Sequence, residues 1–277
     1  MAECLSNAQH GHSALRADPR PTHELISTAL TEPDEHRAWE AVTVLHFRGN
    51  WEVLEAARQL CRSECPQERR LGADILGQLG VPERTYPDQC VEMLLEVLEH
   101  EQDEGVLHAV GVALGHLNDR RGVASLVRLK NHASWQVRYA VVFGLSCLVD
   151  DRAIQTLIEL SSDEDEVIRD WATFGLARQI DPDTQEIRDA LVKRLTDTDP
   201  ETRAEALAGL ARRGDERVIE PLIKELSSDC VARLVVEAAE TIGDPRLYPA
   251  VLQLKAWWDV DPDFLEAALS RCRPQTP

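Results

Sequence analysis

Aromatic residues, long apolar runs and secretion signals are all scarce in this chain. Phe, Trp and Tyr make up 5% of the 277 residues, which fits poorly with a β-rich fold. No apolar run approaches the length that a membrane-spanning helix needs. No secretory apolar segment precedes the main body of the chain. We therefore expect a cytoplasmic protein that does not bind membranes.

Basic residues are also outnumbered. The chain has 30 Lys and Arg against 49 Asp and Glu, which gives a formal net charge of −19. An acidic surface repels nucleic acid and attracts basic partners, although solubility alone would also account for the charge. The balance argues against nucleic acid as a partner and favours a basic protein.

Motifs for catalysis and metal binding are missing. We find no Gly-rich phosphate loop, no nucleophile elbow and no paired Ser/His motif. Cys61 and Cys65 lack the second pair that a zinc site needs, and His10 and His12 lack further ligands. Cys147 lies in an apolar stretch and is predicted to be a small core residue. We expect no catalytic residue, no cofactor and no metal.

What the chain does have is a repeated helical pattern, clearest in residues 133–160. Apolar residues there recur at the spacing of one face of a helix, and a second short helix follows a turn at 149–152. The face of the first helix consists of Val137, Ala140, Val141, Gly144, Leu145 and Leu148. Neither helix can bury its face alone, so this hairpin needs a similar neighbour on each side.

Similar segments occur along the chain with a period of roughly 30 to 38 residues. Most begin with an arginine, and Leu107 takes that place in one copy. The arginines are Arg37, Arg69, Arg138, Arg169, Arg203 and Arg233.

This pattern predicts one continuous array of hairpins over residues 22–272, after a flexible leader at 1–21. Thr22 is expected to cap a first helix at 22–30 that turns Leu25, Ile26 and Leu30 inward, and a last helix at 261–271 closes the end. Asp–Pro pairs predict helix starts at Asp181, Asp199 and Asp261. The expected repeats are 34–62, 66–99, 104–131, 133–160, 164–196, 199–227 and 229–256.

These copies resemble HEAT repeats, specifically the short bacterial type related to the phycobilisome-lyase subunits, over about residues 34–256. The resemblance implies an all-α fold, a right-handed α-solenoid of about seven hairpins with terminal capping helices. It implies little about function, because such repeats serve scaffolds, inhibitors and a few enzymes.

Enzymes of the HEAT class remain the alternative. A HEAT family of hydroxylases holds two irons on repeated His–Glu pairs, whereas His23–Glu24 lies outside the repeat register. HEAT-like DNA glycosylases have a basic groove with Trp, Asp and Arg, and here Trp171 adjoins Asp170, but the net charge has the wrong sign. No Cys or His constellation indicates a bilin-lyase site.

The repeated arginines are predicted to form a structural ladder. An arginine fork matches a carboxylate in a bidentate manner, so a repeating network is expected in which each Arg pairs with an Asp at the end of the same helix or in the next turn. We define the Arg ladder as Arg37, Arg69, Arg138, Arg169 and Arg203, with the candidate acceptors Asp119, Asp150, Asp181 and Asp215.

Acidic and aromatic residues off the predicted core are the candidates for partner binding. Helix capping explains only part of the acidic run at 162–166, and Trp and Tyr are favoured anchors at protein interfaces. We therefore predict a non-enzymatic scaffold or adaptor whose curved acidic face binds a basic protein. An inhibitor or immunity-type protein is a concrete version. The predicted contact residues are Trp39, Glu96, Glu99, Trp135, Tyr139, Asp163, Asp165 and Trp171.

Overall fold

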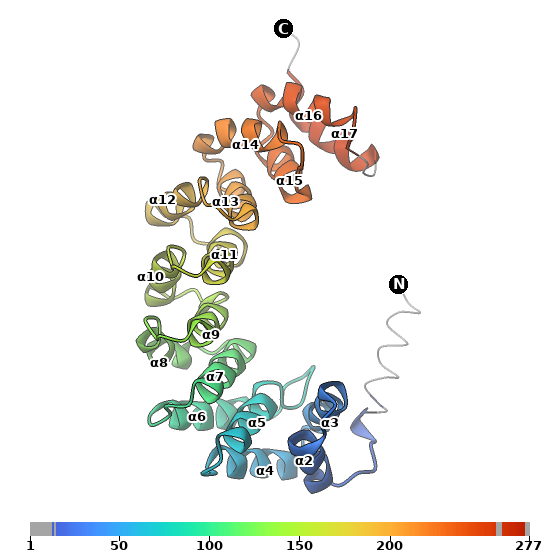
Figure 1. The fold of residues 1–277 in the computed structure, drawn as a ribbon, viewed down its shortest axis with the longest axis vertical. Coiled ribbons are helices and arrows are strands. Elements are labelled where there is room, and N and C mark those ends of the chain that lie inside the picture. The colour runs from blue at the N-terminus through green and yellow to red at the C-terminus, as the bar shows by residue number, and fades with distance from the viewer. Residues whose placement is uncertain (1–12, 14, 259–261, 275–277) are drawn as a thin grey trace. The chain divides into compact units, whose positions relative to one another are not determined.

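The computed structural model describes residues 13, 15–258 and 262–274, and this part of the chain is an all-α solenoid without strands (Figure 1). His10, His12, Asp261 and most of the predicted leader lie outside the described residues. The chain divides into two compact units, Met1–Leu145 and Ser146–Pro277. Each unit is described by itself.

The first unit contains the predicted capping helix and the hairpins that follow it. Its helices pair within residues 35–61, 66–98 and 104–128, and one further helix ends the unit. The helices are α2 (Thr22–Thr31), α3 (Glu35–Arg48), α4 (Trp51–Cys61), α5 (Pro66–Gly77), α6 (Pro87–Leu98), α7 (Glu104–Leu117), α8 (Val123–Arg128) and α9 (Trp135–Leu145).

The second unit continues the same alternation. Short 3₁₀ turns precede α14 and α16, and a π-helical turn, Gly175–Gln179, extends α11. The helices are α10 (Asp151–Leu160), α11 (Glu166–Phe174), α12 (Gln185–Arg194), α13 (Pro200–Arg212), α14 (Ile219–Leu226), α15 (Arg233–Ile242), α16 (Tyr248–Leu254) and α17 (Pro262–Arg271).

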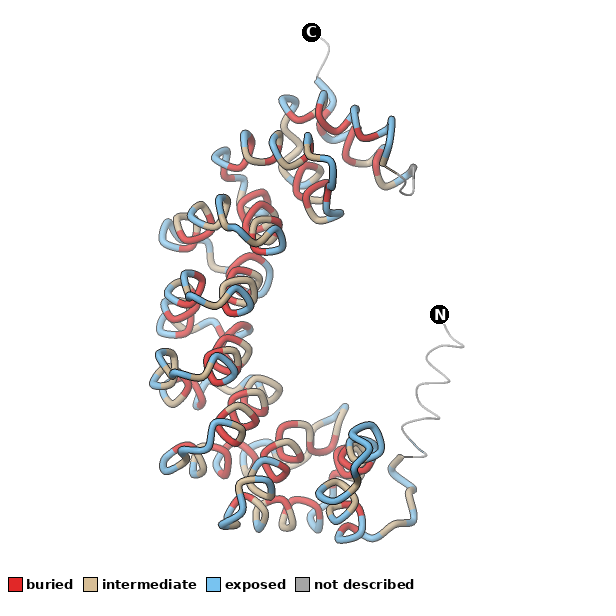
Figure 2. Tube along the Cα trace, in the orientation of Figure 1, coloured by how far each residue is buried: buried red, intermediate tan, exposed pale blue. Residues whose placement is uncertain are grey.

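Two layers of helices make up each unit. We call α3, α5, α7 and α9 of the first unit, and α11, α13 and α15 of the second, the A helices. The B helices are α4, α6 and α8 in the first unit and α10, α12, α14 and α16 in the second. Successive A helices lie side by side within a unit. Buried residues occur on the helices of both layers (Figure 2). The core is therefore a strip along each unit, as expected for stacked repeats.

Close packing between A helices depends on glycine. A Cβ atom on Gly111 of α7 would lie 2.7 Å from the Cβ of Ala140 on α9. In the second unit, a Cβ atom on Gly209 of α13 would lie 2.7 Å from the Cβ of Ala177. Any side chain at these positions would push the neighbouring helix away, so the apolar–Gly steps of the sequence pattern serve helix contact.

Several helix boundaries follow local signals in the sequence. Asp199 accepts a hydrogen bond from the backbone N–H of Thr202 and caps α13, with Pro200 at its first position. Gly49 ends α3 at a φ of +50°, and Asn50 then caps α4. These Asp–Pro and Gly–Asn boundaries are the ones that the sequence predicted.

Other local predictions are wrong. Thr22 is buried within α2 rather than capping it, and Leu30 is 37% exposed rather than inward. Asp181 caps no helix, because α12 begins at Gln185 with Thr184 as its N-cap. Cys147 is exposed, since α9 ends at Leu145 and the chain turns before it.

No helix in the part of the chain that the structure describes is long and apolar enough to span a membrane. Within the same residues, no three His, Cys, Asp or Glu side chains cluster as metal ligands would.

Candidate binding surface

A groove of about 510 Å³ opens on the first unit between α2, α3 and α5. Trp39 forms one wall and is 50% exposed, which is unusual for the largest apolar side chain. The other lining residues are apolar at five positions and polar or charged at four. The lining residues are Ala29, Leu30, Glu35, Ala38, Trp39, Val42, Gln67, Arg70, Leu71 and Asp74.

Asp74 supplies a buried carboxylate to this groove. Its side chain is 23% exposed, and its Oδ2 lies 3.9 Å from Nε of Arg70, too far for a hydrogen bond. Burial raises the pKa of Asp74 to about 6, and the charge of Arg70 opposes this rise only in part. The carboxylate is therefore poorly compensated in the free protein.

His46 fixes the two walls of the groove to each other. Burial lowers the pKa of His46 to about 4, so its ring is neutral at pH 7. Its Nε2 lies 2.9 Å from the backbone carbonyl oxygen of Asp74, and a neutral ring can only donate in that bond. The ring also meets Trp39 edge to face, with centroids 6.1 Å apart. Trp39 and Asp74 are thus held in one arrangement through a buried histidine.

Aromatic rings continue along the A helices of the first unit. His108 on α7 stacks on Tyr139 of α9 at 6.1 Å, and Tyr139 stacks on Phe143 at 6.3 Å. His116 meets Phe143 edge to face at 5.2 Å. The predicted contact residue Tyr139 therefore belongs to a half-buried aromatic row rather than standing alone on the surface.

The second unit carries a pair of poorly compensated carboxylates on its A helices. Burial and the neighbouring Glu205 raise the pKa of Asp170 to about 6. Burial also raises the pKa of Glu205, while Arg178, 3.5 Å away, opposes the rise. Asp170 Oδ1 and Glu205 Oε2 are buried without a hydrogen-bond partner among the described residues. A shallower groove of about 320 Å³ lies beside them, between α13 and α15.

The ladder arginines make one repeated contact. In four copies, Nη1 donates to two backbone carbonyl oxygens, five and six residues earlier, at 2.9–3.1 Å. This contact ties each of these A helices to the turn that precedes it. The four are Arg69, Arg138, Arg169 and Arg203, whereas Arg37 is exposed.

Three ladder arginines also bind a carboxylate at or just after the end of the B helix in their own hairpin. Arg69 pairs with Glu101 at 2.7 Å, Arg169 with Asp197 at 2.9 Å, and Arg203 with Glu225 at 2.8 Å. None of these acceptors is one of the predicted aspartates. The prediction failed because the acceptor lies at the end of a B helix, where its register depends on packing.

The predicted acceptors have another role. Asp119, Asp150 and Asp215 each cap a short helix and bind the arginine two residues later, Arg121, Arg152 and Arg217 respectively. The sequence Asp-x-Arg, repeated at the start of the B helices, was the signal for this arrangement. Asp181 instead pairs with Arg212.

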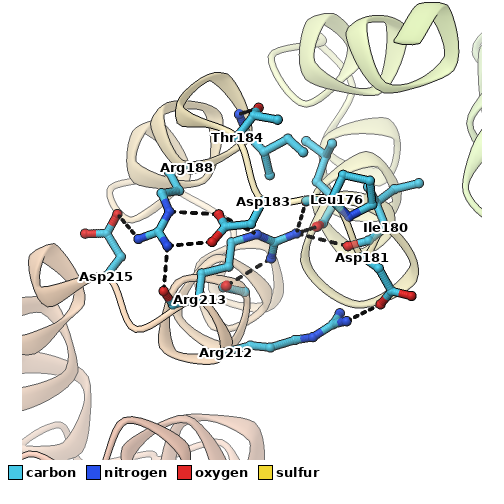
Figure 3. A network of polar contacts seen from close by, with 12 residues as sticks. Leu176, Ile180, Asp181, Asp183, Thr184, Arg188, Arg212, Arg213 and Asp215 are labelled. Atoms are coloured by element: carbon cyan, nitrogen blue, oxygen red, sulfur yellow. Dashed lines mark hydrogen bonds and ion pairs between the residues drawn. The ribbon is translucent and has the colours of Figure 1, made fainter. Parts of the chain in front are cut away.

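In the copy that contains Asp181, a buried arginine holds the loop, and no aspartate caps a helix there. The side chain of Arg213 is 4% exposed and donates to the carbonyl oxygens of Leu176 and Ile180 at 2.8 and 3.0 Å (Figure 3). Arg188 holds the adjoining loop by a bidentate pair with Asp183, at 2.8 and 2.6 Å. These contacts fix residues 180–184 as a loop, which explains why no helix starts at Asp181.

None of the predicted acidic contact residues lines the groove. Glu96 on α6 pairs with Arg62 at 3.2 Å, and Glu99 follows the end of that helix. Asp165 caps α11, and the carboxylate of Asp163 accepts from the N–H of Asp165 at 2.9 Å. Asp165 therefore serves as a helix cap, and the carboxylate of Asp163 holds the turn before α11.

The predicted tryptophans differ in exposure. Trp135 at the start of α9 is 47% exposed. Trp171 is half-buried and meets Phe174 edge to face at 5.7 Å. The sequence analysis missed Asp74, Arg70 and His46 altogether. The available signal in the sequence was Asp74 itself, an acidic residue within the apolar stretch that follows Arg69.

Comparison with known proteins confirms the repeat type. HEAT repeats match residues 91–177, 159–243 and 188–270. Protein YibA of Escherichia coli is 34% identical over 91 residues, which are 33% of this chain and 32% of YibA. The aligned segment thus spans about a third of that relative.

Solved structures show the same fold. A crystal structure of YibA from Escherichia coli covers 95% of this chain and 96% of its own, with a TM-score of 0.78 and 24% identity. A crystal structure of an engineered protein covers 90% of this chain and 76% of its own, with a TM-score of 0.57 and 19% identity.

The phycocyanin-lyase proteins CpcE and CpcF of Nostoc are more distant, at 18% identity and a TM-score of 0.46 over 92% of this chain and 96% of theirs. The HEAT repeat matches together span residues 91–270, more than half of the 277-residue chain. On these matches and its paired helices, the chain belongs to the HEAT repeat family.

Proposed function

We propose that this chain is a non-enzymatic binding protein that holds a basic protein against the A helices of its first unit. The observation that carries the proposal is Trp39, half-exposed at the wall of a groove in a chain of net charge −19. Exposed tryptophan beside a pocket is typical of the residues that contribute most to protein binding.

The charge of the chain supports a basic partner. A net charge of −19 gives long-range attraction for cations, which speeds association and excludes acidic competitors. Several of the predicted acidic residues are occupied as helix caps or ion pairs. The acidic field of the whole chain therefore supports steering, while the contact itself rests on the groove.

An inhibitor or immunity-type protein for a basic enzyme, such as a nuclease toxin, is a concrete form of this function. A HEAT array offers a long surface, and steering by charge suits an inhibitor that must bind before its target acts. We also propose a cytoplasmic location, because the described cysteines are free, as in a reducing compartment.

A capture experiment tests the proposal. The tagged full chain and its Trp39→Ala variant are immobilised, incubated with lysate of the source organism and eluted with rising sodium chloride. A single basic protein that elutes from the wild type by salt, and is reduced on the variant, is the expected result. A partner that is acidic or insensitive to salt would contradict the proposal, as would the failure to capture any specific protein.

A further inference from the structure

The groove between α3 and α5 combines an aromatic wall, an apolar lining and a buried acid. We propose that it takes one lysine or arginine side chain of the partner, with the alkyl stem against Trp39 and the cation at the carboxylate of Asp74. This inference rests on the proposed function, since it names the group through which a basic partner is held.

The shape of the groove suits a long side chain with a charged end. Its volume of about 510 Å³ is in the range of sites for small ligands, and Trp39 and Leu30 at its walls are 50% and 37% exposed. The carboxylate of Asp74 is more deeply placed, at 23% exposure. A lysine or arginine can lie along the apolar walls with its methylene groups and reach the acid with its head.

No group among the described residues donates a hydrogen bond to the carboxylate of Asp74, which is 23% exposed. In the described part of the chain its ion-pair contact is to Arg70 at 3.9 Å, and the Arg70 side chain is 62% exposed and largely solvated. Burial of a charge without direct pairing is costly. A cation from the partner that donates directly to Asp74 would remove that cost, which gives the partner's basic group a specific advantage over an apolar one.

The charged groups that face Asp74 leave the groove negative. Asp74 and Glu35 are the acids of the lining and Arg70 is its basic residue. His46, behind the groove on α3, is neutral at pH 7 because burial lowers its pKa to about 4. Burial and the charge of Arg70 also lower the pKa of His108 on α7. A cation therefore meets two carboxylates and one solvated guanidinium.

The probes for the test are N-acetyl-lysine methylamide and N-acetyl-arginine methylamide, with the neutral N-acetyl-norleucine methylamide as the matched control. They are titrated into the full chain labelled with ¹⁵N at its tryptophans. The signal of the Trp39 indole is assigned by its loss in Trp39→Phe. We expect the two cationic amides to shift this signal saturably and the norleucine amide to leave it unchanged.

Variants separate the acid from the rest of the groove. Asp74→Asn should weaken binding of the lysine amide at least about tenfold, while Glu92→Gln on α6, an exposed acid on a B helix, should leave it unchanged. Arg70→Gln removes the competing cation and should tighten binding. Arg70 is exposed, so this variant remains informative if Asp74→Asn folds poorly. Affinity should also rise as the pH rises through about 6.

Three results would overturn the inference. The first is a norleucine amide that binds as tightly as the lysine amide. The second is a folded Asp74→Asn variant that binds the lysine amide as tightly as wild type does. The third is an Arg70→Gln variant that binds the lysine amide more weakly than wild type does. Failure here is distinguishable from failure of the proposed function. A salt-sensitive partner that the Asp74→Asn variant still binds normally would support the proposed function and contradict this groove chemistry. Binding of the cationic amides without any captured partner would support the groove chemistry and contradict the proposed function.

Discussion

Arg169 on α11 donates from Nε and Nη2 to the two carboxylate oxygens of Asp197, at 2.9 and 3.0 Å. The side chains are only 14% and 4% exposed, and the remaining Nη1 bonds to two carbonyl oxygens of the preceding turn. One arginine thus joins the turn before its own helix to the turn between α12 and α13. Arg69 and Glu101 repeat the relationship in the first unit.

The first prediction concerns this pair. Arg169→Ala should lower the free energy of unfolding by about 3 kcal/mol, because it leaves a buried carboxylate without its main partner. Urea unfolding followed by circular dichroism measures the loss. The matched control is Arg152→Ala, which removes an exposed arginine paired with Asp150 and should have little effect. Equal stability of Arg169→Ala and wild type would show that the ladder does not stabilise the fold.

The same pair predicts a response to acid. Burial raises the pKa of Asp197, but hydrogen bonds from Arg169 and from a backbone N–H outweigh this, and the pKa lies below its ordinary value of 3.8. A lowered pKa in the folded state contributes stability above pH 3.8 that is lost as the pH falls through the folded value. Arg169→Ala should therefore differ from wild type less at low pH than at pH 7. A difference that is constant from pH 7 to pH 2.5 would contradict this account.

The raised pKa of Asp74 predicts the opposite dependence of stability on pH. Its pKa is raised from 3.8 to about 6, so the folded state holds a proton that the unfolded state has lost, and stability should fall as the pH rises between these values. Asp74→Asn should be as stable as wild type near pH 4 and more stable by about 1–2 kcal/mol at pH 7.5, after allowance for the partial exposure of the side chain. Urea unfolding at the two pH values is the measurement. A variant that is less stable than wild type at pH 7.5 would show that Arg70 compensates the carboxylate fully.

Glycine contacts give a prediction about packing. Gly111→Ala should destabilise the first unit by about 1–3 kcal/mol, because the new Cβ would lie 2.7 Å from that of Ala140. Gly105→Ala, on the same helix, meets only the carboxylate oxygen of Asp103 at 3.2 Å and should be neutral or slightly stabilising. Thermal unfolding of both variants measures the difference in melting temperature. Similar melting temperatures for the two variants would mean that α7 and α9 can separate without cost.

The sequence was sufficient for the repeat pattern and for most helix ends, since these depend on local spacing and on caps such as Asp199. It was insufficient for contacts between helices. The acceptor of Arg169 depends on how far α12 extends before Asp197, which no local signal gives. Asp74 was missed for the same reason, because its place in the groove depends on how α3 packs against α5. The hydrogen bond from Arg213 to the π-helical turn was not predicted either. It depends on the length of the loop after that turn, which the repeat period does not give.

The last prediction compares the two tryptophans that share a repeat position, Trp39 and Trp171. Trp39 is 50% exposed, and its ring contacts His46 only by an edge, so Trp39→Ala should change the melting temperature little. If Trp39 anchors the partner, the same change should weaken binding by about tenfold or more. Trp171 is half-buried against Phe174, and Trp171→Ala should instead lower stability. Calorimetric melting and partner titration on both variants separate the two roles. Loss of partner binding by Trp171→Ala with stability intact, and none by Trp39→Ala, would move the binding surface from the first unit to the second.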